Sequence, residues 1–93
     1  MANIDVCADG WPAHRRDEFT WVNSSDDTAV ISQNGANTWP FTLPSPIDVS
    51  GRRSNGGPGR TDCSIRSDVP TPHTYSYIVN ICPGVGPKTV VIT

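Results

Sequence analysis

The segment FTWVN at residues 19–23 decides the fold class of this chain. Its side chains alternate in character, so an extended strand places Phe19 and Trp21 on one face and the residues next to them on the other. Residues 24–27 follow as a turn, because Ser and Asp side chains hydrogen-bond the nearby backbone. We therefore expect residues 28–32 to return as the hairpin partner of this strand.

Outward from this strand, further short segments carry the same period of two or the same β-forming residues, with Gly and Pro between them. The expected strands lie at residues 3–8, 19–23, 28–32, 47–49, 63–66, 74–79 and 88–93. Residues 39–46 hold three prolines, so they form an edge or crossover segment rather than a central strand. No stretch repeats apolar residues at helical spacing. With eight glycines and nine prolines, the chain is predicted to be all-β.

A chain of 93 residues builds one hydrophobic core, so we expect a single domain over residues 1–93. At this size the free energy gained by burying apolar surface nearly equals the entropy cost of ordering the chain. Stability would therefore gain from a covalent cross-link, an oligomer or a host particle. The net charge of −2 argues against non-specific nucleic-acid binding, and the short apolar runs argue against membrane insertion. The predicted fold is a small antiparallel Greek-key β-sandwich of about seven strands.

The chain has three cysteines, which is a high number for its length. One interpretation is a disulfide with one thiol left over, and the other is three buried thiols in a reducing compartment. We favour a bridge between Cys63 and Cys82, which would close a loop of about 20 residues and stabilise the fold by roughly 3 kcal/mol in the chain-entropy description. A bridge from Cys7 to either of the others is the alternative.

No catalytic constellation stands out, because no histidine is placed to activate a nucleophile, so we expect neither enzymatic activity nor a cofactor. His14, His73 and Cys82 are the residue types that copper prefers. Their spacing does not place two ligands on one element, as metal motifs do. We therefore interpret them as two surface histidines and a structural cysteine, with no metal site.

The strongest local concentration of positive charge is Arg52, Arg53 and Arg60 in the glycine-rich stretch 50–60. It is either a docking arm for an acidic partner surface or nucleic acid, or a mobile solubilising loop. We favour the mobile loop, because the stretch has no aromatic residue to stack a base. Trp39, which precedes a proline, either anchors an interface or caps the core, since tryptophan dominates binding hot spots. These four residues are the candidate interface.

Three smaller features have alternative interpretations. Trp11, also beside a proline, is an interface anchor or a core residue. Residues 23–25 read Asn-Ser-Ser, which fits the glycosylation acceptor pattern and also occurs by chance. Gly56, Gly57 and Gly59 lack the following lysine and hydroxyl of a phosphate loop, so we interpret them as a source of flexibility.

Three segments together resemble the cupredoxin family, the small sandwiches of plastocyanin and azurin. Residues 19–23 resemble the strand that runs into the first copper histidine, and Tyr75-Ser76-Tyr77 resembles the strand that carries the copper cysteine. Residues 88–93 resemble the closing strand of the family. The resemblance covers residues 19–93 and implies a cupredoxin-like sandwich, with an Ig-like sandwich as the other form.

The ligand positions of that family are not filled in this chain. The first histidine would fall within residues 28–30, which read Thr-Ala-Val. The cysteine would fall on Val79 or on Cys82, depending on the register, and residues 83–88 contain no histidine and no methionine. Because a blue-copper site needs two imidazoles and a thiolate, the resemblance implies the scaffold without the copper activity.

The function that remains is a non-catalytic, metal-free β-sandwich that serves as a structural or protein-binding module. A decorating subunit on a virus particle or a cell surface is one form of it, and a homo-oligomer is another. Loops at one end of the sandwich, residues 39–46 and 50–60, are expected to make the contact. The alternative is a secreted or periplasmic copper-binding electron-transfer protein.

The first residues of the chain leave two alternatives for where the protein is found. Residues 1–6 are too short and polar for a signal peptide. We expect either a protein that works where it is made, such as on a virion or assembly surface, or a mature extracellular form with an added Met.

Overall fold

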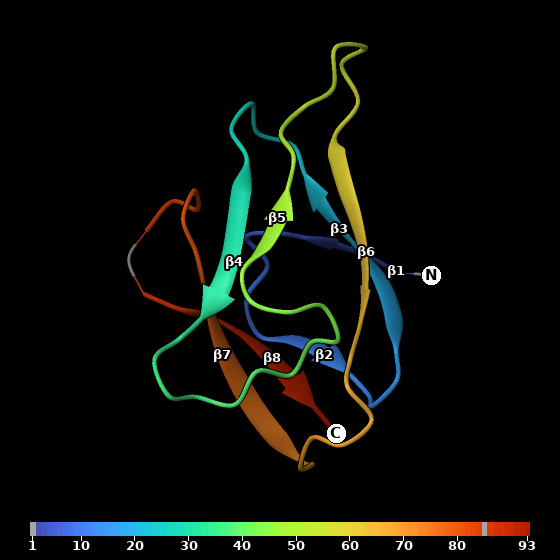
Figure 1. Ribbon diagram of the computed structural model, residues 1–93, viewed down its shortest axis with the longest axis vertical. Coiled ribbons are helices and arrows are strands. Elements are labelled where there is room, and N and C mark those ends of the chain that lie inside the picture. Colours follow the sequence, from blue (N-terminus) through green and yellow to red (C-terminus); the bar gives the residue numbers. More distant parts are fainter. Residues whose placement is uncertain (1, 85) are drawn as a thin grey trace.

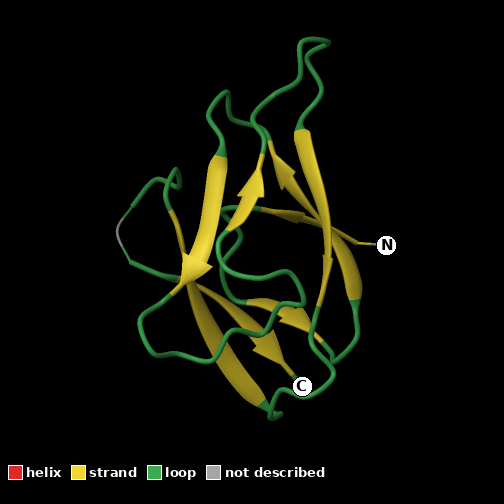
Figure 2. Cartoon of the chain, viewed as in Figure 1, coloured by secondary structure: helices red, strands yellow, loops and turns green. Residues whose placement is uncertain are grey.

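The computed structural model describes residues 2–84 and 86–93, and its regular structure is all β (Figure 1, Figure 2). The strands are β1 (Ala2–Asp5), β2 (Trp11–Ala13), β3 (Glu18–Asn23), β4 (Ala29–Gln33), β5 (Ile47–Val49), β6 (Gly59–Ser64), β7 (His73–Val79) and β8 (Lys88–Ile92). The described residues include no helix, and therefore none that could cross a membrane. The all-β prediction is confirmed.

The strands form two sheets that enclose one core. The order is β1-β3-β6 in the three-stranded sheet and β2-β8-β7-β4-β5 in the five-stranded sheet. Most neighbours are antiparallel, as predicted, but β1 is parallel to β3 and β2 is parallel to β8. The predicted small β-sandwich is confirmed, with two parallel pairings at its edges.

The expected hairpin between residues 19–23 and 28–32 is wrong. β3 pairs with β1 and β6, whereas β4 pairs with β5 and β7 in the opposite sheet. Asn23, which is fully buried, directs this crossing: its Nδ2 donates to the carbonyls of Asp27 at 2.8 Å and Val49 at 3.0 Å. Its Oδ1 accepts from the backbone and hydroxyl of Ser25. The glycosylation pattern therefore begins on a buried side chain that already has its hydrogen bonds.

The segment expected as one strand at residues 3–8 is divided between the sheets. β1 ends at Asp5, residues 6–10 cross the end of the sandwich, and β2 begins at Trp11. Pro12 stands in β2, where an edge strand tolerates a missing backbone donor. Gly10 allows the bend with φ +67°. β2 is not predicted from the sequence, because Gly10 and Pro12 are typical of the end of a strand.

Aromatic rings fill the core between the sheets. Ring centroids lie 5.1 to 6.4 Å apart among Trp11, Phe19, Trp21, Phe41 and Tyr77. The predicted inward face of β3 is confirmed. The interface interpretation of Trp11 is wrong, because it is buried and its Nε1 donates to the Tyr77 hydroxyl at 2.7 Å. That hydroxyl donates to the Ala8 carbonyl, and burial raises the pKa of Tyr77 above its usual range.

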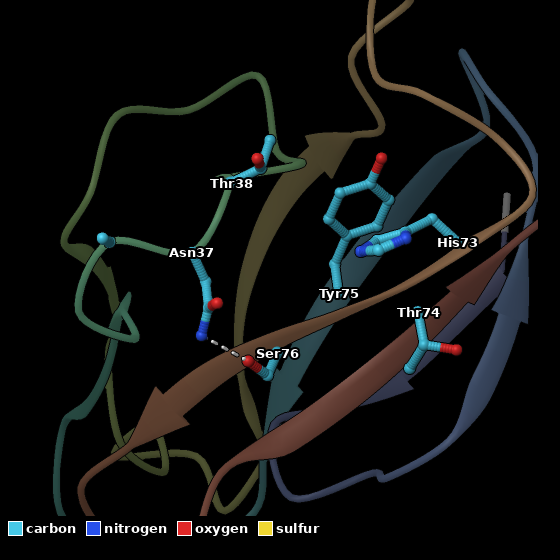
Figure 3. Close-up of a pocket in the computed structure, with 7 residues that line it drawn as sticks. Asn37, Thr38, His73, Thr74, Tyr75 and Ser76 are labelled. Carbon is cyan, nitrogen blue, oxygen red and sulfur yellow. Dashed lines mark hydrogen bonds between the residues drawn. The ribbon is translucent and has the colours of Figure 1, made fainter.

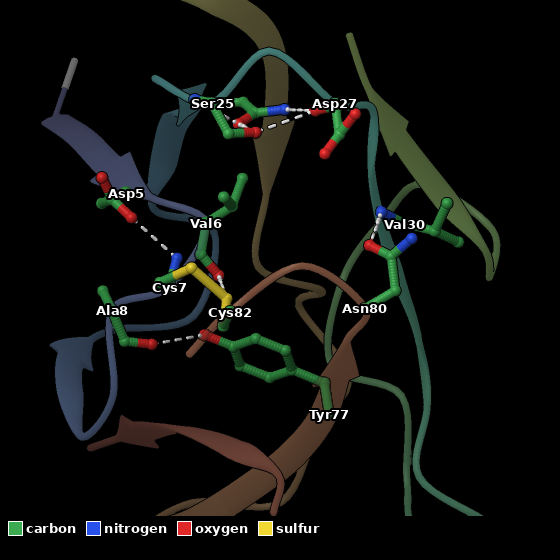
Figure 4. Close-up of a disulfide and its surroundings, with 11 residues drawn as sticks. Asp5, Val6, Cys7, Ala8, Ser25, Asp27, Val30, Tyr77, Asn80 and Cys82 are labelled. Atoms are coloured by element: carbon green, nitrogen blue, oxygen red, sulfur yellow. Dashed lines mark hydrogen bonds between the residues drawn. A yellow bond between two sulfur atoms is a disulfide. The ribbon is translucent and has the colours of Figure 1, made fainter. Parts of the chain in front are cut away.

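The disulfide joins Cys7 to Cys82, so the favoured pairing of Cys63 with Cys82 is wrong (Figure 4). Cys82 lies beyond the end of β7, where it meets the crossover at residues 6–10, and the two Cα atoms are 5.4 Å apart. Cys63 is a buried free thiol in the three-stranded sheet, where it pairs with Phe19 of β3. The bond spans 75 residues of sequence, which corresponds to about 4.5 kcal/mol in the chain-entropy description.

Candidate functional site

The arginine-bearing loop between β5 and β6 is tied to the turn that precedes β4. The Arg52 backbone N–H donates to the Ser25 carbonyl at 2.7 Å, and its guanidinium donates to the Ser24 carbonyl at 2.7 Å. The same guanidinium lies 3.9 Å from the Asp26 carboxylate. Arg52 therefore supports two neighbouring loops at one end of the molecule, which is a structural use of a predicted interface residue.

Two glycines in this region serve close packing. A Cβ on Gly59 would lie 1.6 Å from the Ser50 carbonyl oxygen, and one on Gly51 would lie 2.3 Å from the Asp26 carbonyl oxygen. The interpretation of Gly59 as a source of flexibility is therefore wrong, because the backbones touch at that point.

Trp39 lies at the opposite end of β6 from the arginine loop. Its carbonyl accepts from Arg66, just past the last residue of β6, at 2.9 Å, whereas the loop of Arg52 and Arg53 precedes the first residue of β6. The indole is half-buried against Phe41 and donates to the Leu43 carbonyl at 2.7 Å. Trp39 thus caps the core, and the prediction of one interface that joins residues 39–46 to residues 50–60 is wrong.

The outward face of the three-stranded sheet is charged. In β6, Arg60 and Asp62 are exposed and alternate with the buried Gly59 and Cys63. Arg60, one of the predicted interface residues, therefore belongs to this face. Asp5 and Glu18 add exposed carboxylates at the ends of the neighbouring strands.

The outward face of the five-stranded sheet is almost free of charge. Its inward residues are buried and its outward residues alternate with them along each strand. Among the described strands, Asp48 of β5 is the one charged residue on this side. Among the described residues, Ile78 on the central strand β7 is the large hydrophobic residue that stands exposed, at 41 %. We call the outward side chains of the three inner strands the neutral face: Val30, Ser32, Thr74, Ser76, Ile78, Thr89 and Val91.

A polar pocket of about 190 Å³ adjoins the neutral face beside β7 (Figure 3). It is lined by Ala36, Asn37, Thr38, His73, Thr74, Tyr75 and Ser76. The pocket exists because β4 ends at Gln33 and pairs with β7 only as far as Tyr77, so the first half of β7 extends past its neighbour. A loop runs where β4 would have continued.

Side-chain amides hold this loop at a distance from the strand. Asn37 Nδ2 and Asn34 Nδ2 donate to Ser76 Oγ at 3.0 and 3.1 Å. Within the loop, the Asn37 N–H donates to the Asn34 carbonyl, and Gln33 Nε2 donates to the Asn37 carbonyl at 2.7 Å. The wall of the pocket is therefore a structured turn that contacts β7 through the Ser76 hydroxyl.

The far wall of the pocket is formed by two rings in contact. The His73 imidazole meets the Tyr75 ring edge to face, with centroids 4.6 Å apart. The Tyr75 hydroxyl donates to the Pro70 carbonyl, and burial raises the pKa of Tyr75. The pocket thus offers hydroxyl, amide and imidazole groups with no carboxylate or guanidinium in its lining.

The residue types that suit copper lie apart. His73 begins β7, whereas Cys82 follows the end of that strand and is bonded to Cys7. His14 Nδ1 lies 3.2 Å from the Thr93 carbonyl oxygen. The described residues contain no group of three His, Cys, Asp or Glu side chains that could hold a metal ion.

The neutral face and the pocket are not among the features predicted from the sequence. The prediction for residues 74–79 rests on Tyr75 and Tyr77, and assigns no role to their outward neighbours Thr74, Ser76 and Ile78. The lack of charge at these three positions is a signal that the sequence contains. The length difference between β4 and β7, which forms the pocket, is not visible in the sequence.

Comparison with known proteins found no matching family model, curated protein or solved structure. The two outward faces and the pocket are therefore the features from which a function can be inferred.

Proposed function

We propose that this chain is a non-catalytic, metal-free β-sandwich module that binds a partner protein through the neutral face. The observation that carries the proposal is a sheet surface whose three inner strands present no charged side chain, with Ile78 on the central strand at 41 % exposure. Charged residues are depleted at the centre of protein interfaces, and exposed apolar surface marks contact sites. The partner that fits is an uncharged surface on a larger assembly.

The charge distribution favours one orientation on such a partner. Exposed charges on β6 and in the loop of Arg52 and Arg53 lie away from the neutral face. Water keeps these groups solvated while the opposite side is covered. The Asp9 carboxylate, which lies beside Thr89 of the neutral face, stays paired with the Thr89 hydroxyl and N–H. This arrangement suits a decorating subunit with one side on its host and one side in solvent.

The neutral face is small for a stable complex. Strands about 4.8 Å apart and about five residues long give the whole five-stranded sheet a face of roughly 400 Å², of which the neutral face is the inner part. A stable complex buries about 800 Å² on each partner. One copy would therefore bind weakly by this face alone.

The alternative of a copper carrier has less support. The cupredoxin resemblance places the copper cysteine at Cys82 or at residue 79, depending on the register. The Cys82 sulfur is bonded to Cys7, and the side chain of Val79 has no atom that can bind a metal. Titration of reduced protein with copper(II) tests this alternative. We expect no intense thiolate-to-copper absorption, and a stable blue complex that Cys82→Ser abolishes would favour the carrier instead.

A differential binding experiment tests the proposed function. The chain, its Ile78→Lys variant and its Asn3→Lys variant are used to capture partners from the natural source, with quantification by mass spectrometry. Asn3 is the matched control, because it is an exposed strand residue on the other sheet. We expect one partner retained by the parent and by Asn3→Lys and reduced about tenfold or more by Ile78→Lys. Equal retention by all three would contradict the proposal.

A further inference from the structure

We propose that the free edge of β7 at Thr74 and Ser76 is a docking site for an extended, uncharged peptide segment, which enters the polar pocket as an added strand. This inference rests on the proposed function, because the segment comes from the partner protein. It adds a site that acts through backbone hydrogen bonds, separate from the side-chain contacts of the neutral face.

The first half of β7 has a strand neighbour on one side only. β8 pairs with it from His73 to Tyr77, whereas β4 pairs with it only from Tyr77 to Val79. Asn34 leads the chain away from the sheet where the β4 ladder would have continued. The edge of β7 opposite β8 is thus without a strand over about four residues.

Hydrogen-bond parity identifies which backbone groups lie at this free edge. The Asn80 N–H donates to the Val30 carbonyl at 3.4 Å across the β4–β7 ladder. In a strand, the N–H and C=O of successive residues point to opposite edges, so the even-numbered residues of β7 direct these groups toward β4. Thr74 and Ser76 therefore direct theirs toward the pocket, and Tyr75 directs its own toward β8.

The loop opposite this edge leaves those groups open. Asn34 and Asn37 reach the Ser76 hydroxyl, and neither donates to the β7 backbone. In the described part of the chain, no turn or loop hydrogen bond reaches the backbone of Thr74 or Ser76. Figure 3 shows Asn37 and Thr38 on one side of the pocket and the strand residues on the other.

The dimensions match a short piece of extended chain. The pocket beside this edge has a volume of about 190 Å³. An extended chain advances about 3.4 Å per residue and pairs with an edge at a spacing of about 4.8 Å. Three residues of a partner would span this edge, and the first and third of them would hydrogen-bond to Thr74 and Ser76, as in other cases of strand addition.

The lining determines the side chains that such a segment can carry. Hydroxyl, amide and imidazole groups surround the pocket, and no formal opposite charge is present to pair with a buried carboxylate or ammonium. Small neutral residues such as Ser, Thr and Val fit both the volume and the chemistry. A segment with Lys or Glu at the central position would bind more weakly.

The test uses the full chain, labelled with nitrogen-15, and the capped peptide Ac-Thr-Ser-Val-Ser-Thr-NH2 as the probe. Amide hydrogen exchange is measured first without peptide. We expect the amides of Thr74 and Ser76 to exchange roughly a hundredfold faster than those of Tyr75 and Tyr77. Saturating peptide should slow the two exposed amides about tenfold and shift the resonances of Asn37. Protected Thr74 and Ser76 amides without peptide would overturn the inference.

Two controls test the backbone role. Thr74→Pro removes one donor at the free edge and no bond to β8, so it should abolish peptide binding while the protein stays folded. The same peptide, N-methylated at both the valine and the serine after it, lacks an N–H toward the β7 edge in either register. It should fail to bind the parent, which keeps the test valid if Thr74→Pro unfolds. Unchanged binding of the methylated peptide would overturn the inference, as would a neutral disaccharide that shifts the pocket resonances while the peptide does not.

The two proposals fail separately. Ile78→Lys should keep peptide binding and lose the partner, because Ile78 is not part of the pocket. If the peptide leaves the β7 amides unaffected while Ile78→Lys still loses the partner, only the edge site is wrong. If the peptide binds and Ile78→Lys has no effect on the partner, only the neutral face is wrong.

Discussion

The two outward faces of the sandwich share one core and differ in charge. Arg60 and Asp62 stand on the outside of the three-stranded sheet, whereas the centre of the five-stranded sheet presents Ser76 and Ile78. Core packing does not require this difference, because outward side chains on both sheets lie outside the core. The contrast therefore reflects what each face meets: solvent on the charged side and, in our proposal, a partner on the neutral side.

The largest expected effect comes from the Cys7–Cys82 disulfide, which joins the crossover at residues 6–10 to the segment that follows β7. Replacing Cys7 and Cys82 together by Ala should lower the free energy of unfolding by about 4 kcal/mol, because the unfolded chain gains the freedom of a long loop. Urea unfolding under oxidising conditions measures this change. The matched control is Cys63→Ala, which keeps the disulfide and should cost about 1 kcal/mol. Equal losses from the two changes would contradict the argument.

The next effect concerns Asn23, whose side chain hydrogen-bonds the turn between β3 of the three-stranded sheet and β4 of the five-stranded sheet. Asn23→Ala should lower the free energy of unfolding by about 3 kcal/mol, since it leaves the buried Val49 carbonyl without its donor and frees the turn at residues 24–27. Thermal and urea unfolding check this value. Asn3→Ala, on the exposed β1, should stay within about 0.5 kcal/mol of the parent. A small change at Asn23 would mean that the turn is held in another way.

A smaller effect tests whether folding needs the neutral face. Ile78→Lys should change the free energy of unfolding by less than about 0.5 kcal/mol, because the side chain is exposed. Ile31→Val, on the buried side of the neighbouring strand, should cost about 1 kcal/mol although it is the milder substitution. Chemical unfolding of both variants compares the two sides of one sheet. A large loss at Ile78 would assign it a folding role and weaken the case for binding.

The smallest effect is a pH dependence at the edge of the neutral face. The Thr89 hydroxyl and N–H both donate to Asp9 Oδ1 at 2.8 Å, and these bonds lower the pKa of Asp9 below its ordinary 3.8. A lowered folded pKa means that this stabilisation is present above the unfolded pKa and is lost as pH falls through the folded one. Stability should therefore decline below about pH 4, and Asp9→Asn should reduce that decline. Acid unfolding followed by tryptophan fluorescence compares the two proteins. The same loss of stability with falling pH in both would exclude a contribution from Asp9.

Local alternation predicted much of the architecture. Phe19 and Trp21 share an inward face, and Tyr75 and Tyr77 share another, as the period of two required. This information is local, because each strand must turn its apolar side toward whatever sheet lies opposite. The all-β class and the sandwich followed without knowledge of which strands were neighbours.

Pairing over long distances needed the tertiary structure. The partner of Cys82 is Cys7, at a separation of 75 residues, and nothing near either cysteine in the sequence indicates this choice. Asn23 matches a surface modification pattern and is buried, because a strand distant in sequence supplies the acceptor for its amide. Loop closure depends weakly on length, so sequence proximity of Cys63 was a poor guide.

The candidate site shows the same division. The neutral character of Thr74, Ser76 and Ile78 belongs to the sequence, since it depends only on residue type and on alternation. The pocket beside them depends on where β4 stops relative to β7 and on how Asn37 holds the loop against Ser76. Residue type sets what a face can bind, but only the packing of separate segments decides which backbone edges are left open.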